Sequence, residues 1–208
     1  PFRALALYDS AKIFYDRSID LLRKLNASGR LAFGFKNLGR LHVLQWKNGE
    51  AEQSFGKALE IYEAQNNKHG IADTWFSLSD VSKNMADFPA AIQYVERACA
   101  VNEEIKDEFL EILCLHHRGE IKYRLGEFAD ALKYYFEALA ILKSKDMPSY
   151  LASLYANIGD VYRGLGQNDV SLKYYEEALK LAERIGIKYD IARLYTGMAW
   201  IHKEQHKF

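Results

Sequence analysis

Three carboxylates recur at a fixed interval, and their spacing is the first feature that suggests chemistry. Asp80, Glu120 and Asp160 lie 40 residues apart. Carboxylate oxygens accept hydrogen bonds from basic side chains and from backbone N–H groups, so a row of them is a candidate for binding a second chain. The alternative is that each carboxylate pairs with a cation of its own helix. A lysine or arginine does follow each of them by three or four residues: Lys83, Arg124 and Arg163.

Repeated carboxylates also suggest general acid–base catalysis, but the residues that usually accompany it do not occur beside them. The sequence has no nucleophile–base pair, glycine-rich phosphate loop or His-x3-His metal pair in their company. His116 and His117 are adjacent, so on a helix they point about 100° apart. We therefore expect a groove contact for His116, and no enzymatic activity, cofactor or metal site.

The overall charge argues against two classes of partner. Lysine plus arginine and aspartate plus glutamate number 28 each. Nucleic acids and anionic membranes favour excess positive charge, so we expect neither as a partner. No apolar run approaches the length of a membrane span, and no signal peptide pattern opens the sequence. With Cys99 and Cys114 expected to be buried small residues in a reducing compartment, these observations favour the cytoplasm.

The elements that position these carboxylates are helices repeated every 40 residues. Each copy has a small residue, a large apolar residue four positions later and a second small residue three positions after that. This is the periodicity of one helix face. The small and large residues are Ala11 and Tyr15, Ala51 and Phe55, Ala91 and Val95, Ala131 and Tyr135, and Ser171 and Tyr175.

A second helix face repeats between those copies and ends in a small residue. These small residues are Gly39, Ser79, Gly119, Gly159 and Ala199. Glycine lowers helix propensity, so we expect it to be compensated by close approach of a partner helix's backbone. Each copy is therefore predicted to be a helix pair, with Gly126 and Gly166 in tight turns between the paired helices.

The combined motif resembles the tetratricopeptide repeat, whose signature is aromatic-x2-Leu-Gly-x2-Tyr followed by Ala-x3-aromatic-x2-Ala. One copy matches it nearly throughout, with Tyr155, Ile158, Gly159, Tyr162, Tyr175 and Ala178. The first full copy departs from it at His42, where tyrosine is usual. The usual repeat has about 34 residues. The longer period resembles the branch found in polarity scaffolds of the LGN/Pins type and in bacterial signalling proteins. HEAT arrays share this period, but the glycine and alanine positions argue against them.

The resemblance implies an all-α fold, a right-handed α-solenoid of stacked antiparallel helix pairs. We expect a single array over residues 1–208. Its parts are a partial repeat at 1–30, full repeats at about 31–70, 71–110, 111–150 and 151–190, and a partial repeat at 191–208.

The resemblance also implies that the first helices of the pairs line a concave groove, in which stacking places the three carboxylates in a row. Candidate contacts for a partner are the residues beside the packing face of these helices. They are Lys36, Arg40, Phe76, Asp80, Lys83, Asn84, His116, Glu120, Tyr123, Arg124, Asp160, Arg163, Arg193 and Trp200. For the aromatic candidates Phe76, Tyr123 and Trp200, the alternative is that a neighbouring helix covers them.

The sequence thus favours a non-enzymatic module that holds a peptide or protein segment. The alternative is a sensory or autoinhibitory domain of a larger signalling protein, such as a kinase, cyclase or transcription regulator. An adaptor for chaperone tails is disfavoured, because Lys36 alone keeps its place in the clamp of such family members. Replacing Arg124 and Arg163 with glutamate is expected to weaken binding and to leave the melting temperature nearly unchanged.

Because both ends of the sequence interrupt a repeat, we expect exposed apolar surface there and end-to-end self-association of the isolated chain. Sedimentation velocity over a range of concentrations measures this. A strict monomer at high concentration would contradict the expectation.

Overall fold

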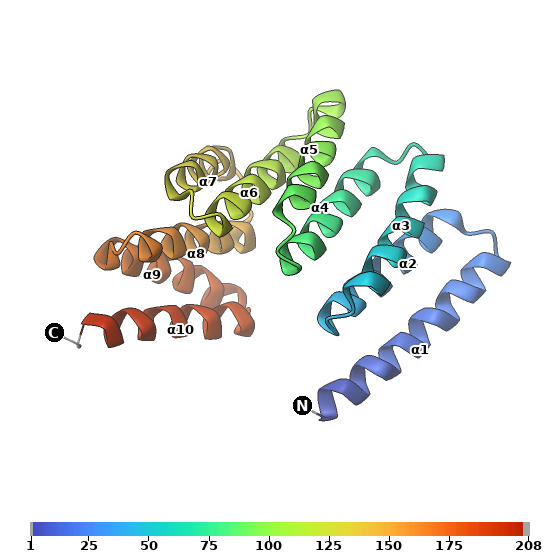
Figure 1. Cartoon of the computed structure of the whole chain (residues 1–208), viewed down its shortest axis with the longest axis horizontal. Helices are drawn as coiled ribbons and strands as arrows, with labels where there is room; N and C mark the ends of the chain where they lie inside the picture. Colours follow the sequence, from blue (N-terminus) through green and yellow to red (C-terminus); the bar gives the residue numbers. More distant parts are fainter. Residues whose placement is uncertain (1, 206–208) are drawn as a thin grey trace. The chain divides into compact units, whose positions relative to one another are not determined.

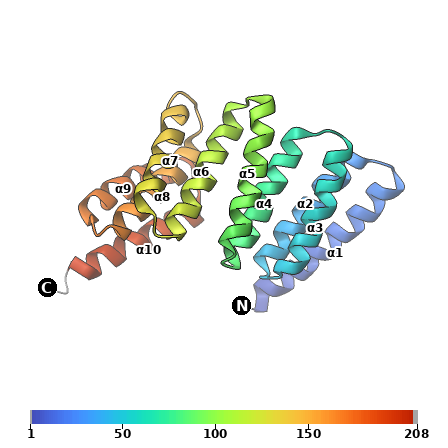
Figure 2. The same cartoon turned by 45° about the horizontal axis from the view of Figure 1, so that its top comes forward.

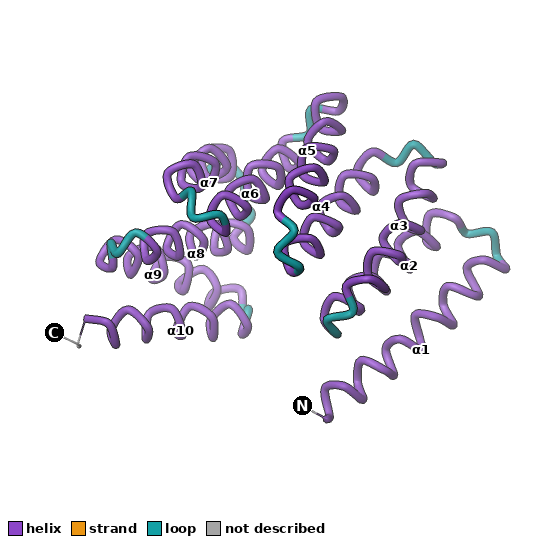
Figure 3. Tube along the Cα trace, in the orientation of Figure 1, coloured by secondary structure: helices purple, strands orange, loops and turns teal. Residues whose placement is uncertain are grey.

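The structure, a computed structural model, describes the backbone of residues 2–205 and the side chains of residues 8–204. Over this range the chain forms ten α-helices and no β-strand (Figure 3). The helices are α1 (Phe2–Lys24), α2 (Ser28–Leu44), α3 (Asn48–Ala64), α4 (Lys68–Asn84), α5 (Phe88–Ile105), α6 (Glu108–Arg124), α7 (Phe128–Leu142), α8 (Pro148–Gly164), α9 (Asn168–Ile185) and α10 (Lys188–Gln205). The predicted all-α class is confirmed.

The helices follow the predicted 40-residue period. Successive first helices begin at Ser28, Lys68, Glu108, Pro148 and Lys188. Each start lies three residues before the repeat boundary expected from the sequence, because the signature residues begin inside the first helix and not at its N-terminal end.

The chain divides into two compact units, Pro1–Asp107 and Glu108–Phe208. In the first unit α2 pairs with α3 and α4 with α5, and α1 packs on α2. In the second, α6 pairs with α7 and α8 with α9, and α10 packs on α9 (Figures 1 and 2). The first helices of successive pairs also touch within each unit: α2 with α4, α6 with α8, and α8 with α10. The antiparallel helix pairs are as predicted, whereas the single array over the whole chain stays a prediction.

In the helix pairs of the second unit, an aromatic ring of the second helix packs directly against a glycine of the first helix. A Cβ atom added to Gly159 would lie 2.7 Å from ring atoms of Tyr175, and one added to Gly119 would lie 2.6 Å from the ring of Tyr135. The hydroxyl of Ser171 also donates a 2.7 Å hydrogen bond to the carbonyl oxygen of Gly159. Close approach at these glycines is thus confirmed, but mainly a side-chain ring makes it. The expectation of backbone contact is corrected accordingly.

The turns between paired helices share a left-handed residue. Gly126 and Gly166 have φ angles of 78° and 72°, which glycine adopts without steric cost. Trp46 and Ala86 stand at the same place in the first unit with φ of 59° each. The predicted glycine turns are confirmed, and the same backbone path forms in two copies without glycine.

Apolar side chains are exposed on α1 and α10, as expected for the two ends. Phe14 is 67% exposed and Tyr189 is 79% exposed. Among the described residues, no helix is both long and apolar enough to span a bilayer. Cys99 and Cys114 are buried, as predicted. Neither is a free thiol, so these cysteines do not support the inference of a reducing compartment.

The contact of the Tyr175 ring with Gly159 predicts the effect of adding a side chain at this glycine. Gly159→Ala places a methyl group against the ring and is expected to reduce the free energy of unfolding by about 1–3 kcal/mol. Gly159→Leu is expected to prevent correct folding. Chemical denaturation followed by circular dichroism measures both.

Gly56→Ala is the matched control, because a Cβ atom there meets nothing within 4 Å. It lies inside α3, so it should leave stability unchanged or raise it by about 0.5–1 kcal/mol. Equal losses at the two glycines would contradict the account of the ring contact.

Candidate functional site

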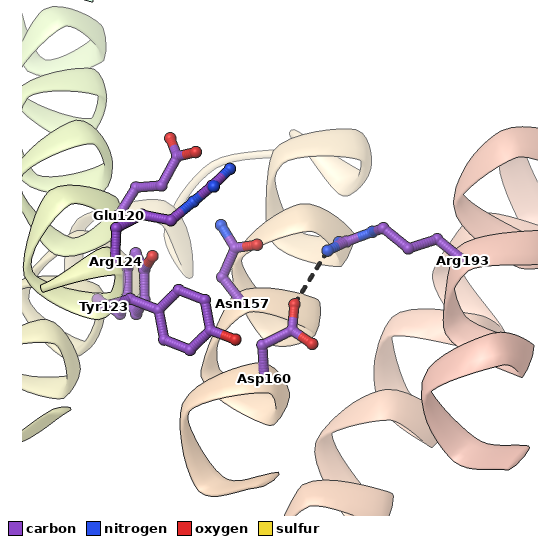
Figure 4. Close-up of a pocket in the computed structure, with 7 residues that line it drawn as sticks. Glu120, Tyr123, Arg124, Asn157, Asp160 and Arg193 are labelled. Carbon is purple, nitrogen blue, oxygen red and sulfur yellow. Dashed lines mark hydrogen bonds and ion pairs between the residues drawn. The ribbon is translucent and has the colours of Figure 1, made fainter. Parts of the chain in front are cut away.

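Polar side chains converge on a hollow in the second unit. The hollow has an empty volume of about 370 Å³, part of which is open to solvent. Three successive first helices contribute most of its lining, and α7 adds one residue (Figure 4). The lining residues are Glu120, Tyr123 and Arg124 of α6, Tyr135 of α7, Asn157 and Asp160 of α8, and Arg193 of α10.

Asp160 anchors one side of the hollow. Its Oδ2 atom lies 3.1 Å from Nη1 of Arg193, which reaches across from α10 (Figure 4). Its Oδ1 atom accepts hydrogen bonds from Nη2 of Arg163 at 3.2 Å and from the hydroxyl of Tyr175 at 2.5 Å. One carboxylate therefore holds donors from α8, α9 and α10, and hydrogen bonds to a charged acceptor are stronger than neutral ones.

Arg163, a candidate for contact with a partner, makes its hydrogen bonds inside this network. Its Nε atom donates to the hydroxyl of Tyr175 at 3.1 Å, and its guanidinium lies over the ring of Trp200, 5.2 Å from the ring centroid. The intrahelical pair with Asp160 is confirmed. Because Arg163 makes these contacts, the expectation that Arg163→Glu leaves the melting temperature unchanged is revised: we expect that substitution to destabilise the unit.

Two buried tyrosines frame the site with neutral hydroxyl groups. Burial raises the pKa of Tyr175 well above its ordinary value, and the charge of Asp160 raises it further. Burial likewise raises the pKa of Tyr135, with Glu120 as the next cause. Both phenols therefore keep their protons at neutral pH, and the hydroxyl of Tyr175 donates its proton to the hydrogen bond with Asp160.

The opposite wall of the hollow comes from α6. The amide nitrogen of Asn157 lies 2.8 Å from Nε2 of His116, so this contact ties α8 to α6. Glu120 is partly buried and Arg124 is exposed at the end of α6. The wall thus presents both a carboxylate and a guanidinium.

The hollow gathers five of the candidates chosen from the sequence, namely Glu120, Tyr123, Arg124, Asp160 and Arg193. Sequence reasoning missed Asn157 and Tyr135 as lining residues. Tyr135 was assigned to the repeated helix face, and its side chain is buried. Asn157 precedes Asp160 by three residues on one helix, so this spacing was the available signal.

The first unit gives its candidates different surroundings. Lys36 is buried and paired with Asp73, which also lies 3.5 Å from Nη2 of Arg40. Phe76 is only 3% exposed, so it is covered rather than open, as the alternative held. Lys83 is buried as well.

The local pair of Lys83 with Asp80 is confirmed at 2.8 Å. Asn84 is exposed at the end of α4. In this unit, ion pairs that involve buried lysines therefore occupy the positions expected to contact a partner.

Comparison with known proteins supports the interpretation of the repeats. Residues 150–208 match the tetratricopeptide repeat family. The second unit contains a tetratricopeptide repeat. The recognition of this repeat in the sequence is therefore confirmed. The matched residues include Asp160 and Arg193, which line one side of the hollow, and Arg163, which pairs with Asp160.

One curated regulatory protein from Bacillus subtilis is similar to this chain in sequence. Regulatory protein RapG of Bacillus subtilis strain 168 is 23% identical over 160 residues, which cover 77% of this chain and 42% of RapG. The chain thus spans less than half the length of that relative.

Two solved structures share the fold at 17% identity each. Aspartyl phosphate phosphatase F of Bacillus subtilis has a TM-score of 0.79, over 96% of this chain and 54% of its own. The Rap conjugation gene regulator of plasmid pLS20, solved in complex with the Phr* peptide, has a TM-score of 0.79 over 91% of this chain and 52% of its own.

The Asp160 network yields a stability prediction. Tyr175→Phe keeps the ring on Gly159 but removes the hydroxyl that bridges Asp160 and Arg163. We expect the free energy of unfolding to fall by about 1–3 kcal/mol, because two charged groups lose a buried partner.

Tyr189→Phe makes the same chemical change at a side chain that is 79% exposed, and it should alter stability by less than about 0.5 kcal/mol. Urea denaturation of both variants gives the comparison. If Tyr175→Phe were as neutral as the control, the hydroxyl would not contribute to the network.

Proposed function

We propose that the hollow between α6, α8 and α10 receives an extended segment of another polypeptide. The observation that carries the proposal is the convergence of Arg124, Asn157 and Arg193 from three successive first helices on one polar hollow. A segment lying across these helices would meet each of them in turn. Repeat proteins that use such surfaces bind by many contacts distributed along the ligand.

The chemistry of the lining suits a peptide backbone. The side-chain amide of Asn157 has both a donor and an acceptor, as a peptide group does, so it can pair with the main chain of any sequence. Arg124 and Arg193 offer fixed forks of donors for carbonyl or carboxylate oxygens, and Glu120 accepts from N–H groups or a basic side chain. Mixed charge favours a ligand that carries both signs over a polyanion.

We propose that this unit binds without catalysing a reaction and that it works in the cytoplasm, with protein and not nucleic acid as its partner. None of the residues that line the hollow is a serine or a cysteine, so the lining offers no nucleophile of these two types. Asp160 is held by three donors, which suits a structural anchor better than a proton carrier. The name of aspartyl phosphate phosphatase F belongs to that protein, and the likeness to it supports the fold alone.

A sensory role within a larger regulator is the second candidate. It is favoured by the similarity to RapG, which is named a regulatory protein and is more than twice the length matched here. The Rap regulator of pLS20 was solved with a bound peptide. In such a role, the same hollow would receive a signalling peptide or a segment of the same chain.

A phage-displayed library of random linear peptides tests the binding proposal. Selected peptides are synthesised with a fluorophore, and their affinity for the 208-residue chain is measured by anisotropy. We expect Arg124→Gln and Asn157→Ala each to weaken binding about tenfold or more, because each loses a hydrogen bond in a partly desolvated site.

Arg184→Gln is the matched control, because Arg184 is exposed on α9 of the same unit and does not line the hollow. It removes the same charge and should leave affinity unchanged. Equal affinity of the selected peptides for all three variants would place binding elsewhere and overturn the proposal.

A further inference from the structure

We propose that His116, His117 and Glu120 form a binding site for a zinc-type divalent ion on α6. Each residue offers one ligand atom, and these atoms all lie within 4.8 Å of one another. Imidazole nitrogen and carboxylate oxygen are ligand types that Zn²⁺ takes in proteins. The site differs from the peptide-binding role of the hollow, although Glu120 borders both.

The sequence argument against a metal site considered the two histidines as a pair. On an α-helix they do point about 100° apart. Glu120 follows His116 by four residues and His117 by three, so it lies on the helix surface between the two directions. The carboxylate of Glu120 therefore lies between the two imidazoles around the helix. This proposal replaces the prediction of no metal site.

The three side chains need a small adjustment to bind an ion. Ligand atoms about 2.0–2.1 Å from Zn²⁺ in a tetrahedral arrangement lie about 3.4 Å apart. His117 is buried, whereas His116 and Glu120 are partly accessible. Rotation about the side-chain bonds of Glu120 and of the two histidines brings the ligand atoms together without moving the helix backbone. Solvent in the adjoining hollow supplies the remaining ligand.

Asn157 stands where a metal-binding histidine needs a partner. Its amide group lies 2.8 Å from Nε2 of His116. The oxygen and nitrogen of an amide are interchangeable by rotation, so Nε2–H of His116 can donate to Oδ1 of Asn157 when the other ring nitrogen, Nδ1, binds the ion. Such outer contacts fix the ring and the tautomer of metal-binding histidines.

The surrounding charge limits the affinity and guides the choice of ion. Arg124 and Arg193 line the hollow beside Glu120, and their positive charge disfavours a cation. With two imidazoles and one carboxylate, the site should prefer Zn²⁺ or Co²⁺ to Mg²⁺ or Ca²⁺, which take oxygen ligands.

Isothermal titration of the untagged chain with ZnCl₂ tests the site, and the visible spectrum of bound Co²⁺ reports its coordination geometry. We expect one ion per chain and no measurable binding of Mg²⁺. Glu120→Gln and His116→Gln should each weaken Zn²⁺ binding at least about tenfold, and Asn157→Ala about tenfold through its effect on His116. Circular dichroism verifies that each variant keeps its helices.

His69→Gln and Glu137→Gln are the controls, because these exposed residues lie on α4 and α7 and outside the cluster. They should bind Zn²⁺ as the parent chain does. The proposal is overturned if the parent chain binds no Zn²⁺, or if folded Glu120→Gln and His116→Gln variants bind it with unchanged affinity. Because no peptide enters this experiment, its result is separate from that of the peptide-binding proposal.

Discussion

The contact of an aromatic ring with a glycine is the interaction on which the second unit depends. Without a Cβ atom at Gly159, α8 approaches α9 closely enough for the Tyr175 ring to lie on its backbone. That position also carries the hydroxyl of Tyr175 to Asp160. Asp160 in turn holds Arg193 of α10. A packing contact inside one helix pair therefore determines where the charged groups of the hollow lie.

The two units share a helix arrangement, but the cation and the carboxylate of an ion pair between first helices have exchanged places. In the first unit, cations on α2 reach a carboxylate on α4, since Lys36 and Arg40 both contact Asp73. In the second, the carboxylate of Asp160 is on α8 and the cation, Arg193, is on α10. Repeats of one backbone design thus tolerate reversal of an ion pair, because the contact needs proximity and not a given direction. The ligand groups that each surface offers differ accordingly.

Periodicity allowed the helices and most of the hollow to be predicted from the sequence. Glu120, Tyr123 and Arg193 were chosen because helical spacing fixes the direction of each side chain, and all three line the hollow. The burial of Phe76, which is 3% exposed, was not predictable, because the spacing of residues within one helix does not show which side chains another helix covers. Arg163 was misjudged for a similar reason: its contact with Trp200 joins α8 to α10, and a pattern within one helix holds no information about that distance.

The left-handed turns have a consequence for how repeats of this kind are detected. Trp46 and Ala86 keep the backbone path that glycine takes in the second unit, at a steric cost of about 1–2 kcal/mol each. The same turn geometry thus forms at two positions that lack the glycine of the other two turns. The family match is confined to residues 150–208, although helix pairs of the same period precede it. A match to the family signature therefore covers fewer helix pairs of this chain than the structure contains.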